Sequence, residues 1–102
     1  MLVQNLPLPP AAPGIQHHLT ALQFGSTRPG PKAFIQAALH ADEVPAMLVA
    51  HHLRQQLTAL EAQGQLLGQV VLVPVANPVG LGQHVLGHHI GRFDLRDGVN
   101  FN

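Results

Sequence analysis

The stretch AFIQAALHADEVPAMLVA, residues 33–50, changes from one kind of apolar pattern to another in its middle. Residues 33–39 form a short, nearly continuous apolar run, which is typical of a strand buried on both faces. From residue 46 onward apolar side chains recur at helical spacing, and Pro45 stands in the first turn, where no backbone N–H is needed. The stretch therefore predicts a strand that passes into a helix, with Asp42 as the N-cap.

The residues after this helix predict a second strand beside the first. Gly64 ends the predicted helix, and residues 68–76, GQVVLVPVA, form a β-branched run bounded by glycine and proline. Strand, helix and strand in this order form a crossover between parallel strands. A further strand is predicted over residues 15–24, where apolar and polar side chains roughly alternate, followed by a glycine- and proline-rich turn over residues 25–32. The sequence thus predicts an α/β fold with a mixed sheet.

The two ends of the chain differ in character from this middle part. Residues 1–14 contain four prolines, at positions 7, 9, 10 and 13. Such a stretch cannot form a helix or a central strand, so we interpret it as an extended arm. From Asn77 onward glycine and histidine are frequent and the periodicity is lost, which indicates a long loop of the kind that carries sites. Residues 15–102 are then one domain, which we expect to be incomplete.

Composition excludes several classes of protein. The 102 residues carry no formal net charge, with five basic and five acidic side chains, and they contain neither tryptophan nor tyrosine. The chain therefore offers no electrostatic or stacking surface for nucleic acid, and no basic surface for an anionic membrane. No apolar run approaches the ~20 residues of a spanning helix. Because residues 1–5 also lack the features of a secretory signal, we expect a cytoplasmic protein.

The low charge content bears on assembly. Charged residues make up 10% of the chain, and 46% of its residues are hydrophobic, whereas about 25% charged residues is usual for a soluble domain. Either the apolar strands are covered by sequence outside these 102 residues, or the chain associates as a homo-oligomer.

A histidine and a carboxylate stand where the predicted strand gives way to the helix. His40 follows the strand and Glu43 falls at the helix start, so their side chains can converge above the sheet edge. Because the chain has no cysteine, any metal must be held by histidine, aspartate or glutamate. These two ligands with a second histidine would suit zinc and leave a position open for water. The alternative is that His40 is a hydrogen-bonded loop residue and that Glu43 only favours the helix dipole.

Three further motifs follow at suitable distances. They are VPVANPVG at residues 73–80, GRFD at residues 91–94 and GVNFN at residues 98–102. Together with H-x-x-E at residues 40–43, they resemble the succinylglutamate desuccinylase/aspartoacylase family, relatives of the zinc carboxypeptidases. The resemblance covers residues 32–102 and implies the N-terminal part of a zinc-exopeptidase-like (carboxypeptidase-like) domain.

The resemblance also implies roles for individual residues. His40 and Glu43 become the first two ligands of one Zn²⁺ ion. Arg92 becomes the arginine that contacts the substrate, polarises the scissile carbonyl and stabilises its oxyanion. Arg96 is its rival, because the spacing from Arg92 to Asn102 is long. Asn102 matches the substrate-binding asparagine that precedes the family's arginine for the substrate carboxylate. That arginine, the third zinc ligand and the general base would all lie beyond Asn102.

The implied activity of the whole protein is zinc-dependent hydrolysis of an amide bond in a small N-acyl amino acid or related carboxylate. The chain would be an inactive fragment of such a deacylase. Two alternatives stay open, a zinc carboxypeptidase acting on peptides and a non-catalytic α/β metal-binding or interaction module. In a further alternative, a residue of the C-terminal loop completes the zinc site locally, if a rigid surrounding holds it. The candidates for this are His84, His88, His89, Asp94 and Asp97.

Overall fold

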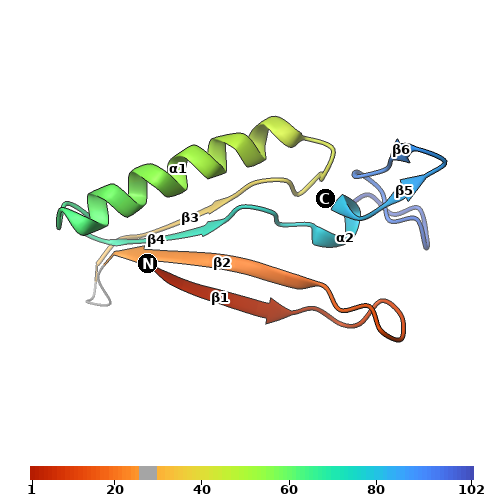
Figure 1. Cartoon of the computed structure of the whole chain (residues 1–102), viewed down its shortest axis with the longest axis horizontal. Helices are drawn as coiled ribbons and strands as arrows, with labels where there is room; N and C mark the ends of the chain where they lie inside the picture. Colours follow the sequence, from red (N-terminus) through yellow and green to blue (C-terminus); the bar gives the residue numbers. More distant parts are fainter. Residues whose placement is uncertain (26–29) are drawn as a thin grey trace.

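A four-stranded mixed sheet with one long helix on one face is the centre of the computed structural model, which describes residues 1–25 and 30–102 (Figure 1). The strands are β1 (Leu2–Pro7), β2 (His18–Gly25), β3 (Lys32–Gln36) and β4 (Gln69–Val73), in the spatial order β1-β2-β4-β3. The β1–β2 and β2–β4 pairs are antiparallel, and the β3–β4 pair is parallel. The predicted α/β fold with a mixed sheet is confirmed.

The predicted crossover is formed by β3, the helix α1 (Val44–Ala62) and β4. Pro45 lies in the first turn of α1, and Gly64 follows the helix end at φ +68, a backbone conformation that glycine adopts readily. The prediction of Asp42 as the N-cap is wrong, because Glu43 occupies that position. Asp42 belongs instead to the preceding turn, where its carbonyl accepts a hydrogen bond from the Val44 N–H at 3.0 Å.

The hydrophobic core lies between α1 and the sheet. Phe24 of β2 and Leu72 of β4 are completely enclosed, and Ala50 and Leu57 of α1 pack onto them. Val49, which the helical spacing also places among the apolar positions, is 66% exposed. The buried stripe of α1 is therefore narrower than its apolar pattern.

The prediction that the first strand of the crossover is buried on both faces is wrong. β3 stands at the edge of the sheet, and Phe34 is 65% exposed. Side chains alternate between the faces of a strand, and α1 packs on the face that carries Ile35. Phe34 pairs with Val71 on the opposite face, which α1 does not cover.

The extended arm predicted for residues 1–14 is partly a strand of the sheet. β1 pairs with β2 from Leu2 opposite Gln23 to Pro7 opposite His18. The prolines permit this strand because it lies at the sheet edge and Pro7 is its last residue. Residues 8–17 then connect β1 to β2.

The long loop predicted from Asn77 onward contains short elements. These are the helix α2 (Pro78–Leu81) and a small hairpin of β5 (His84–Val85) and β6 (His88–His89). The turn predicted over residues 25–32 falls partly on residues 26–29, which lie outside the described residues. Within the described part of the chain, no helix has the length and apolar character needed to cross a membrane.

We predict that Leu72→Ala lowers the free energy of unfolding by about 2–5 kcal/mol, because it leaves a cavity in the core between α1 and the sheet. Urea unfolding followed by circular dichroism measures this change. Leu67→Ala is the matched control, since Leu67 is 91% exposed and its truncation should change stability by less than about 0.5 kcal/mol. Equal effects of the two substitutions would contradict the assigned core.

Candidate metal centre

The loop between β3 and α1 carries His40 and is fixed from the side of β4. Ala76 N–H donates to the Ala37 carbonyl at 2.8 Å, and Asn77 N–H donates to the Ala38 carbonyl at 3.1 Å. Ala38 is buried and adopts φ +55, a left-handed conformation that non-glycine residues adopt only where the surroundings determine it. The backbone that leads into His40 is thus held in one conformation.

Asn77 ties three segments together through its buried side chain. Its Oδ1 accepts a hydrogen bond from Gly80 N–H at 2.8 Å, and its Nδ2 donates to the Leu39 carbonyl at 3.1 Å. The end of β4, the start of α2 and the residue before His40 are therefore connected by one carboxamide. This explains in physical terms why the N-P-x-G pattern at residues 77–80 accompanies H-x-x-E in the sequence.

Gly91 brings the C-terminal segment into contact with the His40 loop. Its carbonyl accepts a hydrogen bond from Ala41 N–H at 2.9 Å. A Cβ atom at Gly91 would lie 2.3 Å from the Asp42 nitrogen and 2.7 Å from the Ala41 carbonyl carbon, so only glycine fits there. Arg92 follows Gly91 directly and therefore lies beside the start of α1.

Five side chains meet at this point. His40 Nδ1 lies 3.2 Å from Glu43 Oε1, and His40 Nε2 lies 2.9 Å from Asn100 Oδ1. Arg92 Nη2 donates to Glu43 Oε1 at 2.8 Å, while Arg92 Nε stands 3.8 Å from Asp42 Oδ2. The His40 side chain is only 12% exposed, whereas Glu43 and Arg92 are each about half exposed. The cluster therefore has a largely enclosed imidazole at its base and charged groups at its open side.

The structure separates the two rival arginines. Arg92 reaches Glu43, but Arg96 forms an ion pair with Asp94, with Nη2 and Oδ2 2.6 Å apart. The Arg96 guanidinium and backbone N–H lower the pKa of Asp94, and the Asp94 carboxylate raises the pKa of Arg96. Arg96 is thus engaged in the turn at residues 94–99. Asn102, the other predicted site residue, is exposed and follows Asn100 of the cluster by two residues.

Sequence reasoning missed Asn100. It lies within the GVNFN motif, in which the resemblance assigns a role only to Asn102. The structure places Asn100 against Phe93 in a β-bridge, and its side chain reaches His40. Asn100 reaches the site because residues 93 and 100 pair. A single sequence does not reveal this pairing.

The separation of His40 Nδ1 and Glu43 Oε1 fits a zinc ion. In a tetrahedral site with bonds of about 2.0–2.2 Å, two ligand atoms stand about 3.4 Å apart, close to the 3.2 Å observed. In residues 1–25 and 30–102, however, no group of three histidine, aspartate or glutamate side chains could hold a metal. The cluster thus contains two suitable ligands for zinc, and no described residue adds a third.

Among the described residues, the C-terminal histidines and aspartates do not complete a metal site with His40 and Glu43. His84 and His89 stack on each other with ring centroids 4.8 Å apart, and His89 Nε2 lies 3.0 Å from the Gly80 carbonyl oxygen. Asp94 is bound to Arg96, and Asp97 Oδ1 accepts from Val99 N–H at 3.0 Å. These four side chains organise their own turns. In the described residues neither they nor His88 form a three-ligand group with His40 and Glu43.

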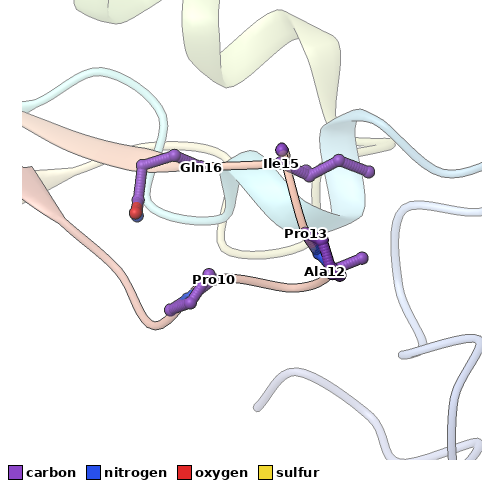
Figure 2. Close-up of a pocket in the computed structure, with 6 residues that line it drawn as sticks. Pro10, Ala12, Pro13, Ile15 and Gln16 are labelled. Atoms are coloured by element: carbon purple, nitrogen blue, oxygen red, sulfur yellow. The ribbon is translucent and has the colours of Figure 1, made fainter.

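An open pocket of about 500 Å³ lies elsewhere, in the connection between β1 and β2 (Figure 2). Its lining residues are Pro10, Ala12, Pro13, Gly14, Ile15 and Gln16. This lining contains no titratable side chain, so the pocket offers apolar contact and no catalytic group. The chemistry of the described residues is concentrated at His40, Glu43 and Arg92.

The fold and cluster together define a class of α/β domain whose site stands beyond the carboxyl ends of parallel strands, here β3 and β4. Residues 29–100 match the family model described as the succinylglutamate desuccinylase/aspartoacylase catalytic domain. The chain therefore belongs to this family, whose members are deacylases. A search of curated proteins gave no match.

Two solved structures are similar to this chain in fold and sequence. One is a succinylglutamate desuccinylase/aspartoacylase family protein from Shewanella amazonensis, with 32% identity, a TM-score of 0.75, and coverage of 98% of this chain and 26% of that chain. The other, from Shewanella frigidimarina, has 32% identity, a TM-score of 0.74, and coverage of 97% and 26%. The chain thus spans about a quarter of the length of these relatives.

We predict that Gly91→Ala disrupts the junction between the C-terminal segment and the His40 loop. The new Cβ would overlap backbone atoms of residues 41 and 42, so the free energy of unfolding should fall by about 2 kcal/mol or more. Gly82→Ala is the matched control, because the nearest atom to its Cβ would be 3.6 Å away, at an ordinary contact distance. Urea unfolding compares the two variants. A Gly91→Ala protein as stable as the Gly82→Ala protein would contradict the close approach.

Proposed function

We propose that this chain supplies part of the active site of a zinc-dependent deacylase, with His40 and Glu43 as two ligands of one Zn²⁺ ion. The observation that carries the proposal is the cluster itself. An imidazole nitrogen and a carboxylate oxygen stand 3.2 Å apart, and a guanidinium lies 2.8 Å from the same oxygen. Membership of a deacylase family supports assigning hydrolysis to this cluster.

Each side chain contributes a distinct property to the reaction. When bound, zinc lowers the pKa of a coordinated water towards about 7 and polarises a carbonyl oxygen. His40 presents a ring nitrogen from a largely buried position, and Glu43 adds a negative charge that favours a cation. Arg92 carries a permanent positive charge on a rigid fork of donors. Because these donors already stand beside the ligands, Arg92 can stabilise the charge that develops on the carbonyl oxygen of the substrate.

Completion of the site requires polypeptide other than these 102 residues. The third ligand, the general base and an arginine for the substrate carboxylate would come from sequence beyond Asn102, with Asn102 as a neighbouring substrate contact. Two findings support this proposal. The described residues provide two suitable ligands and not three, and the solved relatives are nearly four times as long as the chain. The complete domain would then be carboxypeptidase-like.

The substrate we propose is a small N-acyl amino acid, because the family name refers to succinylglutamate and to acylated aspartate. Both compounds have an amide bond beside carboxylates, and a permanent cation such as Arg92 suits an anionic substrate. Hydrolysis of such compounds by the protein encoded by the complete reading frame tests the proposal. Cleavage of peptides in preference to N-succinylglutamate or an N-acylaspartate would instead identify a carboxypeptidase.

We predict that His40→Ala and Glu43→Ala each abolish stoichiometric zinc in that complete protein, since each removes one of few ligands. Zinc content after dialysis, measured by mass spectrometry, gives the result. His52→Ala is the matched control, because His52 is exposed on α1 and its loss should leave one equivalent of zinc bound. Retention of a full equivalent in both ligand variants would overturn the assignment.

We also predict that Arg92→Ala lowers turnover by about 10²–10³-fold with zinc still bound, as expected for the loss of a donor to the developing charge. Steady-state kinetics on an N-acyl amino acid provide the measurement. Arg54→Ala, on the exposed surface of α1, controls for the loss of a positive charge and should retain normal turnover. If Arg96→Ala abolishes turnover while Arg92→Ala does not, the role belongs to Arg96 instead.

A further inference from the structure

We propose that Gln83 is a positioning residue that fixes the backbone on both sides of Arg92 and thereby holds the Arg92 guanidinium at the cluster. Gln83 lies in the chain between α2 and β5. The inference rests on the proposed function in one respect, namely that Arg92 acts on the substrate. Its basis is three hydrogen bonds from the Gln83 side chain to the segment of residues 90–95.

The Gln83 carboxamide bonds to this segment before and after Arg92. Its Nε2 donates to the Ile90 carbonyl at 2.8 Å and to the Phe93 carbonyl at 2.7 Å. Its Oε1 accepts a hydrogen bond from Leu95 N–H at 2.9 Å. Both amide hydrogens and one lone pair of the oxygen are therefore in use. Because the bonded residues flank Arg92, the carboxamide determines the path of the chain through that residue.

These three partners require a carboxamide at residue 83. Two of them are carbonyl oxygens, which accept, and one is an N–H, which donates, so the group between them must donate twice and accept once. A carboxylate of the same length would place negative charge against two carbonyl oxygens. A thioether of the same length would offer no donor. Glutamine therefore matches all three backbone groups, and its two isosteric replacements do not.

Gln83 is itself tied to the sheet edge that carries the cluster. Its N–H donates to the Gly80 carbonyl at 3.2 Å, and Gly80 N–H donates to Asn77 Oδ1 at 2.8 Å. Its carbonyl accepts from Ile90 N–H at 2.9 Å, which closes the base of the β5–β6 hairpin beside α2 (Figure 1). A continuous series of hydrogen bonds thus runs from the end of β4 through α2 and Gln83 to the backbone at Arg92.

Arg92 needs this backbone anchor because its own side-chain contacts are weak. The guanidinium is 40% exposed, and exposed ion pairs contribute little. Its shortest contact is with Glu43 Oε1 at 2.8 Å, the atom that also faces His40. A cation bound by Glu43 would repel the guanidinium, so this ion pair alone would not keep Arg92 in place. The backbone on both sides of Arg92 then has to determine where its side chain starts.

The test compares Gln83→Met and Arg92→Ala, singly and together, in the protein encoded by the complete reading frame. Methionine keeps the length of the side chain and removes all three hydrogen bonds. We expect Gln83→Met to lower turnover of an N-acyl amino acid by about 10–100-fold, as displacement of a reacting group does, with one equivalent of zinc still bound. In the Arg92→Ala background the same substitution should cause no further loss, because its effect passes through Arg92.

A second readout measures the anchoring itself, without reference to activity. Hydrogen exchange of residues 90–96, followed by mass spectrometry, should be faster in Gln83→Met, since the Leu95 N–H loses its acceptor. Gln55→Met is the matched control, because Gln55 is exposed on α1 and its side chain bonds to His51. This control should change neither the turnover nor the hydrogen exchange of the segment.

The outcomes are distinct. Normal turnover of a folded Gln83→Met protein, or an equal fractional loss in both backgrounds, would overturn the positioning role. If Gln83→Met does not fold, Gln83→Glu decides by the same criteria, since it keeps an acceptor for the Leu95 N–H and lacks the two donors. Normal turnover of Arg92→Ala would remove Arg92 from the proposed function. Unchanged hydrogen exchange in Gln83→Met would overturn the anchoring of the segment, and either result can occur without the other.

Discussion

The parallel pairing of β3 with β4 is the constraint on which the site depends. Parallel strands end at the same edge of a sheet, so residues 37–43 and 74–80 emerge side by side. Asn77 fastens these two segments by bonding to Leu39 and Gly80 at once. The C-terminal segment then contacts the same edge through the Ala41–Gly91 hydrogen bond. Each later contact at His40 requires this shared edge, and α1 makes it possible by returning the chain to the start of β4.

The charged pairs of the molecule serve different purposes. Glu61 binds the N-terminal ammonium group and the Gly25 N–H, and both contacts lower the pKa of Glu61. This pair ties the start of β1 and the end of β2 to α1. Glu43, in contrast, is about half exposed between His40 and Arg92. Exposed ion pairs contribute little to stability, so stability does not explain why an imidazole, a carboxylate and a guanidinium are gathered there.

The sequence predicted the parts of the structure that local patterns determine. The crossover followed from an apolar run, a helical repeat and a second run, and the positions of Pro45 and Gly64 located the helix. His40 and Glu43 could be placed at one sheet edge for the same reason. Asn100 could not be found, because its contact with His40 spans 60 residues and depends on the turn at residues 94–99. The exposure of Phe34 could not be predicted either, since an apolar run does not reveal whether both faces of a strand are covered.

The exposed face of β3 and the incomplete ligand set are related. Phe34 is largely exposed on an edge strand, and Leu48 and Val49 are exposed on the neighbouring helix. An edge strand with apolar side chains can pair with a further strand. The low charge content of the chain has two explanations. Either other polypeptide covers the apolar strands, or the chain self-associates. The zinc proposal favours the first, because additional polypeptide that supplies a ligand near His40 would reach the same side of the domain as β3.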